Sequence, residues 1–442
     1  MIIWIVPIID LISAGVGGHT ISYLFVSGKE LWLRFVTFFG GHISSGVTLG
    51  IQVEAVFGII FCYTYVYTVT KNIARSFGAA FSFYAFLFFL GSMPSIIALF
   101  LPEQGSVSNT IIQSIMSSNV IQNNIHPSFS ATNTGLLDLA FNKIMIGINT
   151  IAAILATLLL LFLTARKKFI AIIKNNRIKI IFYFFLLFTF GVSLANTWSK
   201  NWIDIQSYIL AIIALVCAAM FSICQNDIHD EKIDAVSNPN RPLVSKVLEK
   251  TDMEIASKIF LLFALLSAYA SSHYVFFFTV LMIFIYFIYS NPPLRLKKFV
   301  ILKTSLISLA CVASVLNGFF LINTDKSIVA FPWGLVVAIF IFHAATANIR
   351  DIKDIEGDRI DGIRTLPVML GLEKSKKILA GTICFFYILI PWYLTTPFLL
   401  IPSIIAVIFS WYFITQKDYK EWKGFAVHMI YLIFIIGTII LK

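Results

Sequence analysis

Charged side chains are scarce in this sequence. Of its 442 residues only 12% are Asp, Glu, Lys or Arg, whereas 59% are hydrophobic, including 43 Phe. This composition excludes an ordinary soluble globular protein. Apolar runs long enough to cross a bilayer recur along the whole chain, and a helix satisfies its own backbone hydrogen bonds inside a bilayer. We therefore expect an all-α polytopic membrane protein.

Cysteine is also scarce. The five cysteines all lie inside apolar runs, and no two of them form a C-x-x-C pair. This pattern indicates packed thiols and argues against disulfides or a cysteine metal site. The first apolar run lacks a basic n-region and a small-residue cleavage site, so we interpret it as a retained helix rather than a cleaved signal peptide.

Lys and Arg are absent from residues 101–135, a polar segment rich in Ser and Asn. If the apolar runs alternate across the membrane, this segment is external and most basic residues lie on the opposite side. The positive-inside rule makes that side cytoplasmic. The formal net charge of +11 then reflects topology and anionic headgroups, and it gives no support to a nucleic-acid partner.

The basic run at 166–179, RKKFIAIIKNNRIK, separates two groups of expected membrane spans. We place a domain boundary there, with an accessory domain of about four helices over 1–172 and a nine-helix domain over 173–442. Residues 29–45 are expected at the membrane interface because they combine Trp with Arg. The expected spans are 1–26, 47–70, 77–100, 136–165, 180–198, 205–225, 256–272, 274–290, 300–322, 329–347, 378–395, 397–415 and 424–441.

Two acidic segments follow apolar runs on the predicted cytoplasmic side. The first is NDIHDEKID at 226–234, and the second is RDIKDIEGDRID at 350–361. Each contains polar residues four apart: Asn226, Asp230 and Asp234 in the first, Asp354 and Asp358 in the second. In a helix such residues share one face. Because like charges at that spacing repel, a cation must compensate them.

Mg²⁺ fits this donor set, because it takes carboxylate oxygens, keeps several waters and bridges to phosphates. Two such faces across a cavity would hold two Mg²⁺ and a diphosphate. An alternative is that both segments are solvated helix ends, which is usual for charge runs, but their matching spacing and position favour the metal site. His229 has no second histidine at ligand spacing and is expected to be exposed. The cations suited to outer phosphate oxygens are Arg241, Lys297, Lys298, Arg350, Lys353 and Arg364.

These segments resemble motifs of the UbiA family of membrane prenyltransferases. NDIHDEKID is similar to N-x-x-x-D-x-x-x-D, and DIEGD to D-x-x-x-D. Three further strings resemble family segments: NPNRPL at 238–243, YSNPPLRLKK at 289–298 and GIRTLPV at 362–368. LVSK at 243–246 departs from the I-P-S-G of related branches, which leaves the loop shape and the acceptor open. The resemblance covers about 173–442.

The resemblance implies a ring of nine helices around a central cavity, in which a prenyl group passes from its diphosphate to a membrane-embedded acceptor. Loss of diphosphate would leave an allyl cation that aromatic rings stabilise. The implied catalytic residues are Asp230, Asp234, Asp354 and Asp358, and the implied metal ligands are these four with Asn226. The expected contacts to the diphosphate are Asn226, Asp227, Arg241, Tyr289, Lys298, Arg350 and Lys353.

The motif details resemble the digeranylgeranylglyceryl phosphate synthase and chlorophyll synthase branches more than the 4-hydroxybenzoate branch. We therefore expect a long, geranylgeranyl-like donor and a lipid-like or cyclic acceptor, with ether-lipid synthesis as a specific alternative. An ion-coupled carrier is a second alternative, since intramembrane carboxylates can mark ion paths. A carrier should place them near the bilayer midplane, whereas here they follow the spans. A non-catalytic lipid-binding scaffold is a third alternative, disfavoured because every metal position is filled.

Residues 1–172 contain no metal or nucleophile constellation. Four strings in this region resemble the N-terminal half of cytochrome bd oxidase subunit I: SGKELWLRFVTFFG, GVTLGIQVEAVFG, SFGAAFSFYAFLFFLGS and NTIAAILATLLLLFLTARKK. Asn149 stands where that family has a haem-ligating His, and Tyr84 and Gly91 lie on the helix that should carry two acidic residues. We therefore expect no haem here.

Overall fold

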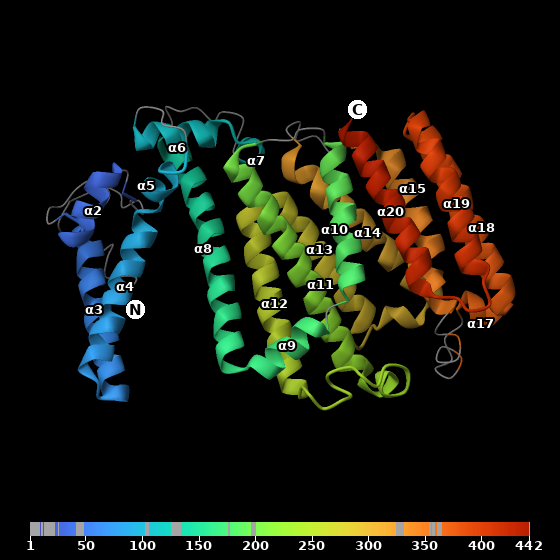
Figure 1. The fold of residues 1–442 in the computed structure, drawn as a ribbon, viewed down its shortest axis with the longest axis horizontal. Helices are drawn as coiled ribbons and strands as arrows, with labels where there is room; N and C mark the ends of the chain where they lie inside the picture. The colour runs from blue at the N-terminus through green and yellow to red at the C-terminus, as the bar shows by residue number, and fades with distance from the viewer. Residues whose placement is uncertain are drawn as a thin grey trace. The chain divides into compact units, whose positions relative to one another are not determined.

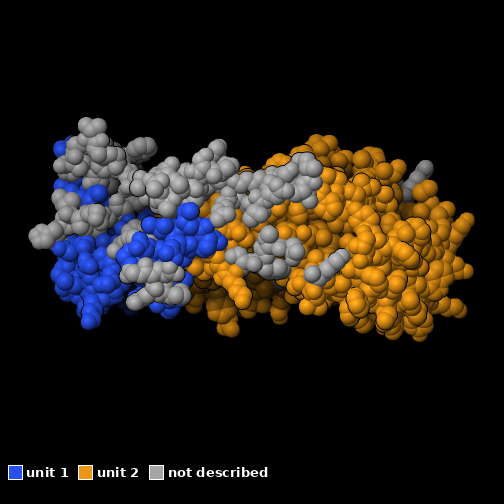
Figure 2. All heavy atoms as spheres, turned by 90° about the horizontal axis from the view of Figure 1, so that it is seen from above, with its two compact units in different colours: residues 1–117, 130–139 blue, residues 118–129, 140–442 orange. Residues whose placement is uncertain are grey.

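The regular structure of the computed structural model is helical, and no strand occurs among the residues that it describes (Figure 1). Those residues are 9, 12, 23–24, 26–40, 48–101, 106–124, 134–175, 177–195, 200–323, 331–352, 355, 359 and 365–441. The prediction of an all-α protein is confirmed. The chain forms two compact units, residues 1–117 with 130–139 and residues 118–129 with 140–442 (Figure 2). The functional boundary near residue 172 stays a prediction.

The first unit is built around a helical hairpin. Its helices are α2 (Gly28–Val36), α3 (Leu49–Thr70), α4 (Ile73–Gly91), α5 (Met93–Ala98) and α6 (Val107–Met116). Lys71 ends α3 in a left-handed conformation, and the Asn72 side chain accepts a hydrogen bond from the Arg75 N–H at the start of α4. These two caps specify the tight turn locally. Leu24, Phe39, Ala55 on α3 and Phe88 on α4 form a small core.

The second unit contains the longer helices. Its elements are α7 (Asn119–Asn124), residues 140–164 of α8 (Thr134–Thr164), α9 (Arg166–Lys174), α10 (Ile178–Leu194), α11 (Trp202–Ser237), α12 (Lys250–Ser271), α13 (His273–Ser290), η2 (Leu296–Lys298), α14 (Val300–Ile322), α15 (Trp333–Thr346), η4 (Ala347–Ile352), α17 (Leu366–Leu370), α18 (Leu372–Tyr393), η5 (Pro397–Leu399), α19 (Leu400–Thr415) and α20 (Glu421–Ile440). α10 contacts α11, and the succession α11, α13, α14, α15, α18, α19 and α20 returns to α10. The helices therefore close a circuit.

Two glycines let α10 approach α14 closely. A Cβ on Gly191 would lie 1.9 Å from the Val315 carbonyl oxygen, and a Cβ on Gly318 would lie 1.9 Å from the Phe188 carbonyl oxygen. Small residues permit such backbone approach between membrane helices, where dispersion contacts supply much of the association energy. The packing fixes the rotation of α10 and therefore the direction of the side chains on its other face.

The helices are long and apolar enough to make this a multi-pass integral membrane protein. Among the described residues, ten helices qualify as candidate spans, and α9 with α10 forms a bent pair that qualifies jointly. Large apolar side chains such as Ile301, Phe398 and Ile401 are exposed on their outer faces, as expected for contact with lipid. The five cysteines are free, and four of them are buried, which agrees with the prediction of packed thiols.

Some predicted spans differ from the helices found. The predicted span 1–26 lies almost entirely outside the described residues. The span predicted at 77–100 is α4 followed by the short α5, because Pro94 starts a new helix. The span predicted to end at residue 225 continues as α11 to Ser237, so the first acidic segment lies on a continuous helix. Ion pairs with neighbouring loops offset the repulsion expected there.

Candidate functional site

The first acidic segment occupies the last turns of α11. Asn226, Asp230 and Asp234 are four residues apart on one helix and therefore share a face. Asp227, Asp230 and Asp234 are only 2%, 8% and 4% exposed. The alternative of solvated charges at a helix end is therefore wrong for this segment. Buried carboxylates require compensating partners.

Asp227 is held by three partners. Arg241 Nη1 lies 2.6 Å and Arg177 Nη2 lies 3.1 Å from Asp227 Oδ1, and Asn175 Nδ2 donates to Oδ2 over 2.7 Å. Arg241 also pairs with Asp234. The loop after α11, which carries NPNRPL, thus folds back so that one guanidinium links two carboxylates of the first segment.

Asp230 is held by the loop between α13 and α14. Arg295 Nη2 lies 2.6 Å from Asp230 Oδ1, and Lys297 Nζ pairs with the other carboxylate oxygen. Lys297 Nζ also donates to Asn226 Oδ1 over 3.3 Å, as does Ser290 Oγ over 3.2 Å. The string YSNPPLRLKK therefore reaches the acidic face of α11, although the chain separates the two by more than one membrane span.

Burial opposes ionisation at this face. It raises the pKa of the Asp234 carboxyl, against the opposing attraction of Arg241. It lowers the pKa of the Lys297 ammonium, against the stabilising charge of Asp230. Each group is desolvated, and its charge is favoured chiefly by its partner. Because both members of each ion pair are poorly hydrated, a divalent cation could bind the carboxylates while a polyanion binds the basic side chains.

The second acidic segment is described only in part. Asp354, Asp358 and Lys353 lie outside the described residues, as do the side chain of Arg350 and the whole of Arg364. Asp351 of η4 is buried and pairs with Lys303 at the start of α14. This pair holds the turn that leads into the segment.

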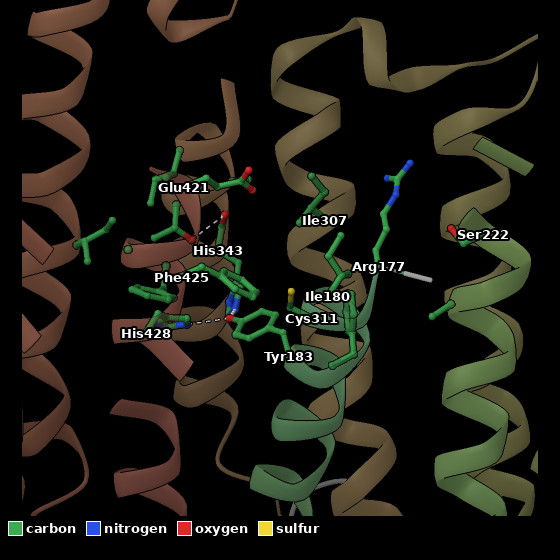
Figure 3. Close-up of a pocket in the computed structure, with 18 of the residues that line it drawn as sticks. Arg177, Ile180, Tyr183, Ser222, Ile307, Cys311, His343, Glu421, Phe425 and His428 are labelled. Atoms are coloured by element: carbon green, nitrogen blue, oxygen red, sulfur yellow. Dashed lines mark hydrogen bonds between the residues drawn. The ribbon is translucent and has the colours of Figure 1, made fainter. Parts of the chain in front are cut away.

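A cavity of about 210 Å³ opens beside Asn226, and Figure 3 shows part of its lining. One end is lined by Asn226, Ser290 and Arg177, together with residues 346–347 and Ile349 at the entrance to the second segment. The other end is lined by Tyr183 and His343 with His428. Aromatic rings along the cavity are those of Tyr183, Phe184, Tyr286, Tyr289, Phe342, Phe425 and Tyr387. The first acidic segment and the turn preceding the second therefore border one space.

The donor set at this end suits a hard cation. α11 presents one amide oxygen and two carboxylates in a row, the oxygen ligands that Mg²⁺ takes. No group of three or more His, Cys, Asp or Glu side chains within the described ranges is arranged to hold a metal ion. The remaining predicted ligands, Asp354 and Asp358, lie outside those ranges. The residues present thus fit one half of a shared cation and anion site.

Not every predicted residue reaches the site. Tyr289 lines the cavity, whereas Lys298 is exposed and makes no ion pair among the described residues. His229, expected to be exposed, is half-buried beside Asp230 and Lys297 because α11 continues past it. Sequence reasoning gave no site role to Arg295, although YSNPPLRLKK contains it, and used Arg177 only as a sign of topology.

Comparison with known proteins places the chain in a family. The family model for the UbiA prenyltransferase family matches residues 183–435. A chloroplastic chlorophyll synthase of Oryza sativa subsp. japonica is 27% identical over 203 residues, which cover 40% of this chain and 49% of that protein. A digeranylgeranylglyceryl phosphate synthase of Sulfurisphaera tokodaii is 27% identical over 170 residues, covering 38% of this chain and 59% of that protein. The chain thus spans about half the length of the curated relatives it matches.

Two solved structures align with part of the chain. A UbiA homolog from Archaeoglobus fulgidus bound to GPP and Mg²⁺ is 18% identical and aligns with a TM-score of 0.45 over 59% of this chain and 97% of that chain. An apo UbiA homolog from Aeropyrum pernix K1 is 20% identical, with a TM-score of 0.46 over 60% and 98%. The sequence-based identification of the family over about 173–442 is confirmed by the family match. The resemblance of residues 1–172 to cytochrome bd oxidase subunit I is not borne out.

Proposed function

Because the chain belongs to the UbiA prenyltransferase family, we propose that it transfers a prenyl group from its diphosphate to a lipid-soluble acceptor in the membrane. The observation that carries the proposal is the Asn226–Asp230–Asp234 face of α11, whose two carboxylates are buried and whose Asn226 lines an aromatic-lined cavity. Such a face suits a charged head group, and such a cavity suits an apolar chain. The two parts of a prenyl diphosphate need both.

The metal in this proposal is Mg²⁺, and two ions would be held between the acidic segments and the diphosphate. Asn226, Asp230 and Asp234 would hold it from one side, with Asp354 and Asp358 completing the ligand set. When bound, Mg²⁺ would neutralise the negative charge of the departing diphosphate and so favour ionisation of the allylic C–O bond.

The basic residues of the site exchange partners in this scheme. In the structure, Arg241, Arg295 and Lys297 neutralise the carboxylates of α11. With those carboxylates holding a divalent cation, the same three basic side chains would be positioned to bind outer phosphate oxygens. Their charge–charge hydrogen bonds are among the strongest available to proteins, and they withdraw negative charge from the leaving group. Arg177, at the cavity wall, can contribute in the same way.

The wall of the cavity would stabilise the other product of ionisation, the prenyl cation. An allyl cation is stabilised by the faces of aromatic rings, and Tyr286 and Tyr289 are among the rings that line the space. The apolar wall also limits the access of water, which would otherwise capture the cation. The acceptor nucleophile then attacks C1 of the prenyl group and forms the new bond.

The acceptor and the donor length are finer parts of the proposal. The relatives named chlorophyll synthase and digeranylgeranylglyceryl phosphate synthase favour a cyclic or lipid-like acceptor and a long, geranylgeranyl-like donor. We propose that the acidic segments face the cytoplasm, because most Lys and Arg lie on the same side of the predicted spans. Residues 1–172 are proposed as an accessory membrane domain.

The test is direct turnover by the purified protein in detergent or lipid nanodiscs. Labelled prenyl diphosphate is incubated with Mg²⁺ and two acceptors, a prenyl glyceryl phosphate and a chlorophyll precursor, and the lipid extract is analysed for a prenylated product. Product that requires both Mg²⁺ and acceptor supports the proposal. Absence of any product, combined with metal-independent transport of a labelled ion in proteoliposomes, would favour the carrier alternative.

A further inference from the structure

Two cavities follow one another along the same helices. The first is the cavity of about 210 Å³ beside the acidic face, and the second, of about 170 Å³, has a wall made almost entirely of apolar side chains. Along α10 and its N-cap Arg177, Arg177 and Ile180 line only the first cavity, Tyr183 lines both, and Leu187 and Phe190 line only the second. Tyr183 therefore stands at the junction.

The helices α20 and α15 also contribute residues that line both cavities. On α20, Glu421 and Phe425 line only the first cavity, His428 lines both, and Ile435 lines only the second. On α15, Phe342 and His343 line both cavities. Three helices thus bring four side chains together between the two spaces, namely Tyr183, Phe342, His343 and His428.

Hydrogen bonds hold this group in one arrangement. His343 Nδ1 lies 2.7 Å from the Ile339 carbonyl oxygen and must donate to it. His343 Nε2 in the neutral ring is then an acceptor, and the Tyr183 hydroxyl donates to it. The Tyr183 oxygen can in turn accept from His428 Nε2, at 2.9 Å. His428 Nδ1 is left to accept from the Tyr387 hydroxyl, at 3.1 Å.

This order of donors satisfies each group without any charge. Figure 3 shows the Tyr183 hydroxyl directed at the two imidazoles. A connected network in apolar surroundings is rigid, because breaking any one bond leaves a buried polar atom without a partner. His428 also stacks on the ring of Phe342, with ring centroids 4.9 Å apart. The phenol ring of Tyr183 is thus fixed across the junction.

We propose that Tyr183, fixed by His343 and His428, is the floor of the prenyl-chain site and sets the longest donor that the protein accepts. The inference rests on the proposed function. The first cavity spans Ala219 to Asn226 on α11 and Glu421 to His428 on α20, which corresponds to a depth of about 10 Å at the rise of an α-helix. A geranyl chain suits that depth, whereas an extended geranylgeranyl chain meets Tyr183. Tyr183 thus favours a donor shorter than the geranylgeranyl-like one that the sequence motifs and the names of the relatives suggest.

The test measures binding and transfer separately over a series of donors. Non-hydrolysable thiodiphosphate analogues of dimethylallyl, geranyl, farnesyl and geranylgeranyl chains are titrated against the full-length protein with Mg²⁺. The floor predicts that affinity rises with length until the chain reaches Tyr183 and then falls. In Tyr183→Ala the two cavities join, so the optimum moves to longer chains, with geranylgeranyl affinity rising about tenfold or more relative to geranyl, as expected for newly buried methylene groups.

Two controls separate the floor from general loosening. Tyr183→Phe keeps the ring and should keep the wild-type length optimum. Leu187→Ala enlarges only the second cavity and should also leave the optimum unchanged. If Tyr183→Ala does not fold, His428→Ala removes another side chain of the same floor and should move the optimum in the same direction.

The outcomes are distinct. The proposal would be contradicted by an optimal donor length that is unchanged in both Tyr183→Ala and His428→Ala. It would also be contradicted by a wild-type affinity that does not depend on donor length. Binding that depends on donor length, without prenyl transfer to any acceptor, would support the role of Tyr183 and count against the proposed function. Loss of the optimum in Leu187→Ala would also contradict the assignment to Tyr183.

Discussion

Arg295 Nη2 lies 2.6 Å from Asp230 Oδ1, so the loop between α13 and α14 closes directly onto the first acidic segment of α11. Arg295 is 23% exposed and Asp230 11% exposed at their side chains. A partly desolvated guanidinium beside a carboxylate can pass to a phosphate oxygen when a metal ion occupies the carboxylate. This contact gives the loop a role in binding the substrate head group.

Replacing Arg295 should therefore impair substrate binding more than replacing the neighbouring Lys298. We expect Arg295→Ala to raise KM for the prenyl diphosphate about tenfold or more, the scale of one charge-assisted hydrogen bond. Lys298→Ala should change KM little, because that side chain is exposed and outside the ion-pair network of the described residues. Lys246→Ala, which removes an exposed cation paired with Glu231, is the matched control. Equal effects of Arg295→Ala and Lys298→Ala would favour the sequence-based assignment instead.

Removing one carboxylate from each acidic segment should abolish most turnover. Asp230→Asn and Asp354→Asn each remove a ligand charge and should lower kcat about 100-fold or more, with a raised requirement for Mg²⁺. Glu231→Gln, on the same turn of α11 but 41% exposed, should retain near wild-type activity, and so should His229→Ala. Near wild-type turnover by either aspartate variant would exclude that residue from the metal site.

Arg241 should contribute to stability as well as to binding. Its guanidinium pairs with Asp227 and Asp234, whose side chains are 3% and 6% exposed. Arg241→Ala leaves the negative charges of these two carboxylates less compensated. We expect this to lower the free energy of unfolding by about 3 kcal/mol and to lower the melting temperature in detergent. Added Mg²⁺ should stabilise this variant more than it stabilises the wild type, because the ion replaces the lost positive charge. An equal Mg²⁺ shift in both proteins would argue against metal binding at these carboxylates.

The segment before residue 172 should matter for the stability of the second unit. Asp204, 4% exposed at the start of α11, accepts hydrogen bonds from the backbone N–H groups of Asn119 and Val120, each over 3.0 Å, and from Ser118 Oγ. A chain beginning at Ile173 loses these donors and leaves a buried carboxylate uncompensated. We expect it to insert and retain some transfer, but to melt below a chain that begins at Ser118.

The control for that comparison is Asp204→Asn. In the chain that begins at Ile173 this variant should recover part of the lost stability, because it removes the uncompensated charge. In the full-length protein it should be destabilising. No difference between the two shortened chains would show that the contact with α7 is unimportant, and no transfer by either would show that residues 1–117 are required.

The sequence predicted the helical class and the acidic face of α11 because both follow from local periodicity. Spacing by four residues places Asn226, Asp230 and Asp234 together whatever the tertiary fold. It could not predict which cations meet them. Lys297 and Lys298 are adjacent in sequence, and only the path of the loop through η2 turns Lys297 inward.

The role of Tyr183 could not be predicted from the local sequence either. It lies in a run of apolar and aromatic residues that predicts a membrane span, and nothing local distinguishes it from the neighbouring Phe182 or Phe184. Its partners His343 and His428 are contributed by α15 and α20. Their convergence depends on the closure of the helical circuit and on the close approach of α10 to α14 at Gly191 and Gly318, which are long-range properties.

The central claim is that the two acidic segments bind one diphosphate together. Hydrogen exchange of residues 225–250 and 348–365, measured with Mg²⁺, with a prenyl thiodiphosphate and with both, tests it most directly. Mg²⁺ screens the repulsion between the carboxylates and the diphosphate, so each ligand should strengthen binding of the other. Both segments should become protected together, and the protection with both ligands should exceed the sum of the separate effects. Independent responses, or one segment left unchanged, would contradict it.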